Sequence, residues 1–169
     1  MKKVLITGAL GQDGVILSKL YQKKNFKVFG FVKTKQKTGV KKVIYKKNNL
    51  KSKNKIKNHL QVIKPSIIVH LASSNNSYLK RKNKKNYKIN YVQNLKCTKN
   101  LLNSVVENKL KTKFIFAGSS LMFKNNVKKK VSEKDHFKSS EHYGKYKIDS
   151  HKFILSLKKR KKITASTVI

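Results

Sequence analysis

The fold is decided by the stretch Val4-Leu5-Ile6-Thr7-Gly8-Ala9-Leu10-Gly11-Gln12-Asp13-Gly14. Its first four residues predict a buried strand, and the residues after them predict a tight loop and the start of a helix. Glycines at this spacing let the chain turn sharply, let the backbone approach a ligand, and let the helix pack on the strand. The free N–H groups at the start of such a helix attract anions. The stretch therefore predicts a loop that binds the pyrophosphate of a dinucleotide, with an ordinary tight turn as the alternative.

Short apolar runs alternate with longer segments of helical spacing along the rest of the chain. We expect strands at Val4 to Thr7, Val28 to Val32, Val43 to Tyr45, Ile67 to Leu71, Phe114 to Ala117 and Ile163 to Ile169. We expect helices at Val15 to Tyr21, Ile56 to Ile63, Tyr91 to Val106 and Gly144 to Leu157. Several strands are continuously apolar, which is typical of strands covered by helices on both faces. This order predicts an α/β fold with a doubly wound parallel sheet of the Rossmann type.

The charge of the chain is extreme, because 43 Lys and Arg residues face only 6 Asp and Glu residues, for a formal net charge of +37. Arg81 and Arg160 are the only arginines, whereas specific phosphate and base contacts favour the bidentate fork of arginine. We therefore interpret the lysine excess as the result of codon bias, and runs such as Lys158 to Lys162 as solvated surface. Nonspecific binding of polyanions is the functional alternative, and we expect no specific nucleic-acid partner.

Several classes of protein are excluded. A single cysteine, Cys97, excludes a disulfide-stapled secreted scaffold, and we expect it to be buried in a helix rather than reactive. Glycines interrupt the N-terminal segment that briefly resembles a signal peptide, and no stretch approaches the roughly 18 apolar residues that cross a bilayer. We expect a cytoplasmic protein, without membrane contact, that forms one dinucleotide-binding domain over residues 1–169. The histidines and the scarce acids show no metal-ligand spacing, so we assign no metal.

A second motif, Tyr143-Gly144-Lys145-Tyr146-Lys147, places a phenol and an ammonium four residues apart on one face of a helix. An ammonium near a phenol helps the phenol to exchange a proton with a substrate hydroxyl, which serves hydride transfer. In so lysine-rich a chain, chance spacing is the alternative. Ser119 follows the strand that ends at Ala117, where an α/β sheet presents its ligand contacts. Its hydroxyl either polarises a substrate oxygen or caps a helix.

Together these motifs resemble the extended short-chain dehydrogenases/reductases, and within them the NAD(P)-dependent nucleotide-sugar epimerase/dehydratase family. The loop ending in Gly11-Gln12-Asp13-Gly14 is most similar to that of the GDP-mannose 4,6-dehydratases. Further similar segments follow in the family's order, at Pro65 to Ala72, Asn94 to Leu102, Phe116 to Ser120 and Tyr143 to Lys147. The resemblance implies an oxidoreductase or lyase that acts on a nucleotide sugar.

The resemblance also implies roles for individual residues. The catalytic residues would be Tyr143 as the base, Lys147 as the group that holds the ribose and tunes the tyrosine, and Ser119 as the group that orients the sugar hydroxyl. The cofactor would contact Gly8, Gly11, Gln12, Asp13 and Gly14 at its pyrophosphate, Asn49 and Leu50 at its adenine, and Leu71, Ala72, Ser73, Tyr143 and Lys147 toward its nicotinamide.

The end of the second strand bears on the choice of cofactor. NAD-specific Rossmann domains carry an acidic residue there for the ribose diol, but the segment Gly30 to Lys35 contains none. Lys33 suits a 2′-phosphate instead, so we expect NADP rather than NAD.

Two departures from the family bear on activity. Leu121 stands where the dehydratases carry a glutamate that moves protons during elimination of water, so we do not expect elimination by that route. The chain also ends inside the expected sixth strand, whereas relatives continue into a smaller C-terminal substrate domain. We therefore expect a truncated or inactive copy that keeps cofactor binding, completed if at all by a homo-oligomer or another polypeptide. The alternative is a non-catalytic module, either a cofactor sensor or a basic polyanion binder.

Overall fold

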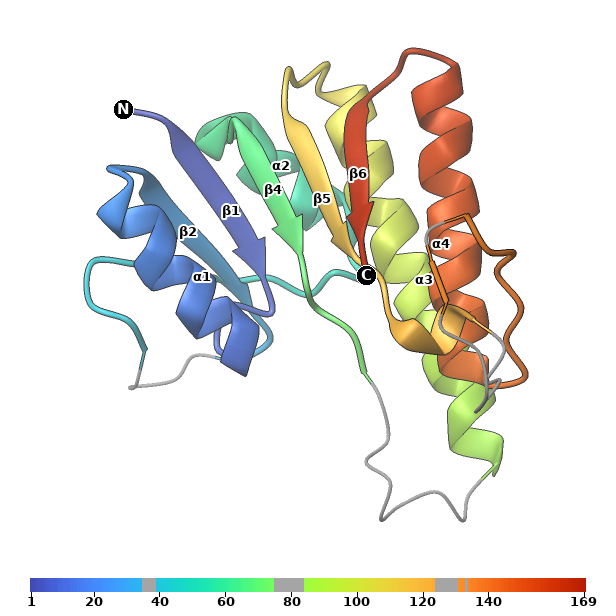
Figure 1. Cartoon of the computed structure of the whole chain (residues 1–169). Coiled ribbons are helices and arrows are strands. Elements are labelled where there is room, and N and C mark those ends of the chain that lie inside the picture. Colours follow the sequence, from blue (N-terminus) through green and yellow to red (C-terminus); the bar gives the residue numbers. More distant parts are fainter. Residues whose placement is uncertain (35–38, 75–83, 124–130, 133) are drawn as a thin grey trace.

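The structure is a computed structural model that describes residues 1–34, 39–74, 84–123, 131–132 and 134–169. The described residues form a sheet of six parallel strands flanked by helices (Figure 1). The strands are β1 (Lys3–Thr7), β2 (Lys27–Val32), β3 (Ile44–Lys47), β4 (Ile67–His70), β5 (Lys113–Ala117) and β6 (Thr164–Val168). The helices are α1 (Gln12–Lys23), α2 (Lys53–Ile63), α3 (Lys84–Glu107) and α4 (His142–Lys159), with a short 3-10 helix, η2 (Ser120–Met122).

The strand order in the sheet is β3-β2-β1-β4-β5-β6. The chain moves outward from β1 to β3 and then returns to place β4 on the other side of β1, with Thr7 opposite His70 in the register. The loops that follow β1 and β4 therefore leave the sheet in opposite directions, which opens a crevice at its carboxyl edge. This arrangement confirms the predicted α/β fold and fixes where a ligand would bind.

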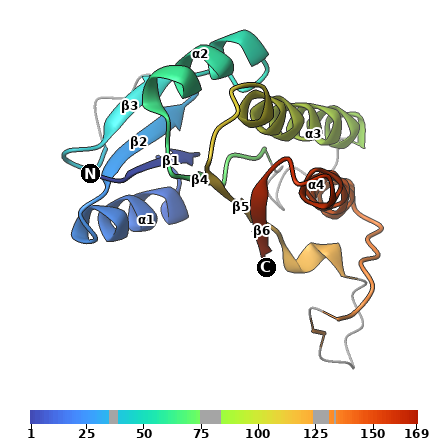
Figure 2. The ribbon, with the colours of Figure 1, turned by 90° about the horizontal axis from the view of Figure 1, so that it is seen from above.

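The helices cover the two faces of the sheet unequally, as Figure 2 shows. Helix α1 covers one face over β1 and β2, and α2, α3 and α4 lie on the other. Val4 and Ile6 pack toward α1, while Leu5 packs toward the other helices, and all three are completely buried. Burial on both faces explains why β1 reads as a continuous apolar run.

Every predicted strand overlaps an observed one, and every predicted helix lies inside an observed one. The observed helices extend beyond the predicted ranges, where residues such as Lys23, Asn54 and Lys158 are exposed and add nothing to the apolar stripe. The short helix η2 was not predicted. Among the described residues, no helix combines the length and the apolar character needed to cross a bilayer.

Candidate active site

The loop between β1 and α1 is shaped by its glycines. Gly8 has a φ of 71°, a left-handed conformation that suits glycine, and its carbonyl oxygen accepts a hydrogen bond from the N–H of Gly11 at 2.9 Å. A Cβ on Gly14 would overlap the Gly8 carbonyl oxygen and the backbone of Ala9. The helix can therefore lie directly on the loop only because residue 14 has no side chain.

The first turn of α1 presents uncapped N–H groups. Gly11 is the N-cap residue, and no side chain accepts a hydrogen bond from the first turn there. Gln12 and Asp13 begin the helix, and both are exposed. Since the first N–H groups of a helix lack intrahelical acceptors, this end of α1 forms a partly positive site beside Gly11.

A groove of about 360 Å³ runs along the carboxyl edge of the sheet. In Figure 1 this edge of the sheet is the one at the arrowheads of the strands. It extends from the end of β2 and the start of the loop after β3, across the glycine loop, to the segment after β4 and the side of α3. Seven of the residues that the sequence assigns to the cofactor line it, namely Gly8, Gly11, Lys33, Asn49, Leu50, Ala72 and Ser73.

Other predicted cofactor residues lie beside the groove rather than in its wall. Gln12, Asp13 and Gly14 form the adjoining first turn of α1, and Leu71 packs against the apolar cluster on the α1 side of the sheet. Cys97, which we expected to be buried, is half-buried in α3 and lines the groove. Burial raises the pKa of its thiol, which disfavours a reactive thiolate.

The charge of the groove is positive. Lys33 and Lys51 contribute to its wall, and among the described residues that line it none is acidic. Asn48 also lines it and is 3 % exposed; its side-chain amide nitrogen contacts His59 Nδ1 at 2.8 Å. The Oδ1 atom of Asn48 has no hydrogen-bond partner among the described residues. The groove thus offers cations and one buried acceptor to a ligand.

Tyr143 adjoins the groove near the end of β4, although it is not among the residues that line it. Its hydroxyl is 3.3 Å from Oγ of Ser73, which lines the groove. The other tyrosine of the motif, Tyr146, is fully buried with its ring edge-on to Phe116. Of the two phenols, only Tyr143 is therefore placed beside a ligand in the groove.

Lys147 is buried one helical turn after Tyr143. Its Nζ donates a hydrogen bond to the carbonyl oxygen of Ala117 at 2.6 Å, and it lies 5.4 Å from the centre of the Tyr143 ring. Burial lowers the pKa of Lys147 to about 8. The side chain therefore links the end of β5 to the phenol and carries a cation that has lost much of its water.

Ser119 does cap a helix, as one of its two interpretations expected. Its Oγ accepts a hydrogen bond from the N–H of Leu121 at 3.2 Å and so begins η2. Accepting this bond leaves the O–H of Ser119 able to donate. Helix η2 lies against the start of α4, where a Cβ on Gly144 would overlap the carbonyl oxygen of Leu121. The glycine in the motif thus keeps the serine segment close to the helix of Tyr143.

Sequence reasoning missed a chain of buried hydrogen bonds beneath the groove. Ala72 N–H donates to Thr7 Oγ1 at 3.1 Å, and Thr7 Oγ1 lies 2.7 Å from His70 Nδ1. His70 Nε2 lies 3.0 Å from Thr98 Oγ1, which donates to the carbonyl oxygen of Asn94. Because Thr98 uses its proton on that carbonyl, Nε2 must be the donor, and Nδ1 accepts from Thr7.

His70, the histidine in this series of hydrogen bonds, is held neutral. Burial, followed by the nearby charge of Lys147, lowers the pKa of His70 to about 3. The sequence did contain a signal, since Thr7 and His70 are polar residues that end two apolar strands. Only the pairing of β1 with β4 shows that they meet.

Asn94 fixes the segment after β4 from the other side. Its Oδ1 accepts from the N–H of Ser74 at 2.8 Å, and its Nδ2 donates to the Ser74 carbonyl at 2.7 Å. Together with the Thr7 contact, this pair of bonds orients residues 71–74, including the Ser73 that meets Tyr143.

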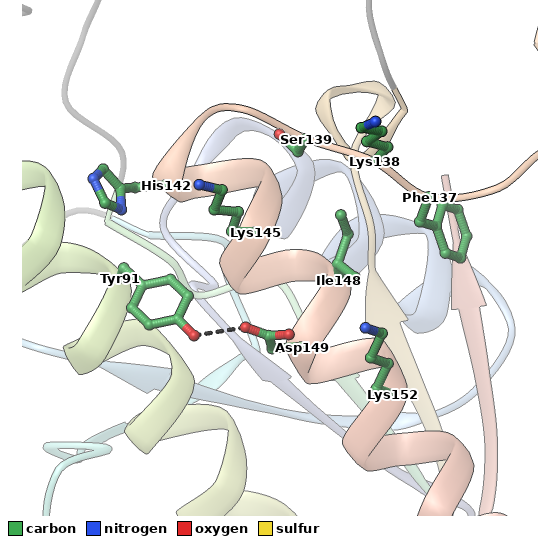
Figure 3. A pocket seen from close by; sticks show the side chains of 9 residues that line it. All are labelled: Tyr91, Phe137, Lys138, Ser139, His142, Lys145, Ile148, Asp149 and Lys152. Carbon is green, nitrogen blue, oxygen red and sulfur yellow. Dashed lines mark hydrogen bonds between the residues drawn. The ribbon is translucent and has the colours of Figure 1, made fainter.

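A second hollow, of about 370 Å³, lies on the outer side of α4 (Figure 3). Tyr91 of α3 donates a hydrogen bond to Asp149 of α4 at 2.6 Å, and this bond raises the pKa of Tyr91. Lys145 and Lys152 come from the same helix as Asp149, while exposed His142 lies at the rim. The contact ties α3 to α4 and so supports the helix that carries Tyr143. In the described part of the chain, no three His, Cys, Asp or Glu residues gather as a metal site would require.

The fold agrees with comparisons with known proteins. A family model described as GDP-mannose 4,6 dehydratase matches residues 5–169. No curated protein matches the chain significantly.

Similar solved structures are about twice as long as this chain. UDP-glucose 4-epimerase from Brucella ovis, in complex with NAD, has a TM-score of 0.87 and 15% identity; the match covers 99% of this chain and 51% of that one. The enzyme of the same name from Thermus thermophilus, also in complex with NAD, has a TM-score of 0.84 and 15% identity; the match covers 98% of this chain and 53% of that one. UDP-glucose 4-epimerase from Thermotoga maritima, with UDP-glucose, has a TM-score of 0.83 and 15% identity; the match covers 98% of this chain and 54% of that one.

The chain thus spans about half the length of these structures, whose low identity shows the fold alone. The family model covers nearly the whole sequence, including the glycine loop, the serine segment and the tyrosine–lysine helix. By this match the chain belongs to the GDP-mannose 4,6-dehydratase family, within the nucleotide-sugar epimerases and dehydratases.

Proposed function

We propose that this chain binds a nicotinamide dinucleotide in the groove and supports hydride transfer at a hydroxyl of a nucleotide sugar. The observation that carries the proposal is the position of Tyr143, whose hydroxyl meets Ser73, a residue of the same groove that the glycine loop lines. A general acid–base group therefore contacts a residue of the same groove that contains the anion site. The NAD and UDP-glucose bound by the similar epimerases agree with this ligand class.

The residues present fit such a cofactor. Gly8 and Gly11 leave room for a pyrophosphate against the uncapped start of α1. Asn49 and Leu50 line the far end, where an adenine would lie, and the unpartnered Oδ1 of Asn48 offers an acceptor there. Ala72 and Ser73 would face the nicotinamide. When bound, the cofactor accepts or returns a hydride.

We propose NADP rather than NAD as the preferred cofactor. Lys33 and Thr34 line the groove at the end of β2, in the position where an acid would select an unphosphorylated ribose. An ammonium and a hydroxyl suit a 2′-phosphate better than a ribose diol, since the phosphate brings negative charge. The similar epimerases are in complex with NAD. A binding measurement must therefore exclude a preference of this chain for NAD over NADP.

The chain's own groups would move the proton that accompanies the hydride. Tyr143 removes the proton of the sugar hydroxyl as that hydroxyl becomes a carbonyl, and returns it in the reverse direction. The Lys147 ammonium, 5.4 Å from the centre of the ring, favours negative charge on the phenol oxygen during this transfer. Ser119 donates its free O–H to the sugar oxygen and orients it. Ser73 holds the phenol in place until a substrate arrives.

Elimination of water is less well supported. The position two residues after Ser119 is Leu121, whose side chain carries no group that moves a proton. Among the described acids, Asp149 is engaged with Tyr91 on the outer side of α4. We therefore propose reversible oxidation of a hydroxyl, as in epimerisation, rather than the full dehydratase reaction.

The test is hydride transfer in a single turnover. The chain with NADP⁺ is mixed with GDP-mannose or UDP-glucose, and the formation of NADPH is followed by absorbance. We expect Tyr143→Phe to lower the rate by a factor of about 10² to 10⁴, the range of general acid–base catalysis, while cofactor affinity changes little. The matched control is Tyr21→Phe, which removes a hydroxyl of the same kind from α1, outside the groove. A Tyr143→Phe variant that keeps the full rate contradicts the proposal, and binding without transfer in the wild type favours a cofactor sensor.

A further inference from the structure

A third hollow, which is lined by lysines, lies at the edge of the sheet opposite the groove. It measures about 660 Å³ and is bounded by the loop from α3 to β5 and the loop from α4 to β6. In Figure 1 these two loops lie side by side at the ends of β5 and β6 away from the arrowheads. The hollow therefore shares no residue with the groove or with Tyr143 and Lys147.

Five lysines from the two loops and adjoining elements line this hollow: Lys111, Lys113, Lys158, Lys161 and Lys162. A turn at the end of α4 gathers three of them, because the N–H of Lys161 donates to the Lys158 carbonyl at 2.9 Å and the N–H of Lys162 to the Leu157 carbonyl at 3.0 Å. Lys113 is the first residue of β5, next to the start of β6. Packing of β5 beside β6 thus brings together cations that are about 50 residues apart in the sequence.

These charges are uncompensated. None of the described residues lining the hollow is acidic, and the ion pairs found in the described part of the chain join Lys53 and Lys57 to Glu107. The positive charges of lysines that line one concavity repel one another, and an anion held among them relieves this repulsion. A general lysine bias places lysines on the surface, whereas here five of them line one hollow.

A buried hydroxyl supplies an independent observation. Thr112 lines the same hollow and is 5 % exposed. Its Oγ1 has no hydrogen-bond partner among the described residues. An unpaired buried hydroxyl costs roughly 1 to 3 kcal/mol, and an anion oxygen in the hollow would give it an acceptor after a small rotation of the side chain.

We propose that this hollow is a binding site for a compact polyphosphate, which the five lysines and Thr112 hold through its phosphate oxygens. Its lining contains no aromatic side chain that would stack on a base, so it fits phosphates rather than nucleosides. None of the large exposed apolar side chains of the described residues lies in it, whereas a lipid surface would be met by apolar groups flanking the cations.

The direct test is calorimetric titration of the whole chain with sodium tripolyphosphate at about 150 mM salt, where diffuse attraction is screened beyond about 8 Å. The first variant carries Lys111→Gln, Lys113→Gln, Lys158→Gln and Lys162→Gln. The matched control carries Lys2→Gln, Lys19→Gln, Lys23→Gln and Lys24→Gln, four exposed lysines before β1, on α1 and at its C-cap, none of which lines the hollow. Both variants lose the same charge.

We expect saturable binding by the wild type, a loss of at least about tenfold in the hollow variant, and a change of less than about threefold in the control. NADPH affinity should be the same in all three proteins, which separates this site from the groove. Equal losses in the two variants, or tighter binding to anionic vesicles or duplex DNA than to tripolyphosphate, would overturn the proposal.

A second variant, Thr112→Val, tests the hydroxyl without a change in charge. It removes the unpaired group and keeps the shape, so the protein should fold at least as stably as the wild type. We expect tripolyphosphate affinity to fall about tenfold, as for the loss of a hydrogen bond to a charged group. Unchanged affinity in a folded Thr112→Val protein would contradict the part that we assign to this residue.

Discussion

The hydroxyl of Tyr143 lies 3.3 Å from Oγ of Ser73, so that the start of α4 meets the segment that follows β4. These residues are 70 positions apart in the sequence and meet because parallel strands place their carboxyl ends at one edge. Ser73 lines the groove, and the hydrogen bonds that Ala72 and Ser74 donate to Thr7 and Asn94 hold this segment in place. The phenol therefore has a fixed position relative to the glycine loop, and the predictions below test the parts of this arrangement.

The glycine loop predicts a contrast between two substitutions. In Gly14→Ala, the new methyl group meets the Gly8 carbonyl and the Ala9 backbone, so we expect a loss of about 1 to 3 kcal/mol in the free energy of unfolding. In Gly11→Ala, the methyl group meets only the Gly8 carbonyl oxygen, at 3.3 Å, but narrows the groove. We expect near-normal thermal stability and roughly tenfold weaker NADPH binding. Equal stability losses in the two variants would contradict this account of the loop.

Cofactor preference should follow the charge at position 33. Lys33 lines the groove at the end of β2, so Lys33→Asp places a carboxylate where a ribose diol would bind. We expect NADPH affinity to fall at least about tenfold and NADH affinity to rise. Lys47→Asp makes the same change in charge on β3, outside the groove, and should leave the ratio of the two affinities unchanged. The ratio is measured by fluorescence titration.

Lys147 should make stability depend on pH in the alkaline range. Burial lowers its pKa to about 8 from 10.5, so between these values the unfolded chain binds more protons than the folded chain. Stability contributed by this group therefore rises from about pH 8 to pH 10.5, by up to about 3 kcal/mol. Lys147→Met should remove this rise, and the difference between the denaturation midpoints of the two proteins across this range measures it. A constant difference would refute the buried position of the ammonium.

His70 should make the stability of the protein depend on pH in the acid range. Its pKa is lowered to about 3 from 6.5, so its contribution to stability is complete above about pH 6.5 and is lost as the pH falls toward 3. The loss reaches about 5 kcal/mol if the ring must be protonated on unfolding. We expect His70→Asn to be less stable than the wild type at pH 7 but to lose less stability on acidification. Urea denaturation at several pH values between 3 and 7 checks the two slopes.

The backbone of the site could be predicted from the sequence because it depends on local patterns. The run from Val4 to Gly14 carries the strand, the loop and the helix start within eleven neighbouring residues, and burial on both faces makes β1 continuously apolar. The spacing of Tyr143 and Lys147 fixes their common face of α4 in the same local way.

Contacts between distant segments could not be predicted. The hydrogen bonds that join Thr7, His70 and Thr98 depend on which strands pair, and the capping bond of Ser119 depends on a short helix with no apolar period of its own. Cys97 was expected in the core, yet it faces the groove because α3 turns that side toward the switch between β1 and β4. Helical spacing predicts a buried stripe but does not tell which part of it borders a cavity.

The central claim is that the carboxyl-edge groove holds a nicotinamide dinucleotide against the start of α1, with Tyr143 beside the groove. Equilibrium titration with NADPH and with NADH at moderate salt tests it most directly. The account predicts saturable binding of one molecule per chain, tighter for NADPH, weakened by Gly11→Ala and unaffected by the four lysine substitutions in the opposite hollow. Absence of saturable binding for both dinucleotides, in a protein that is folded, would contradict it.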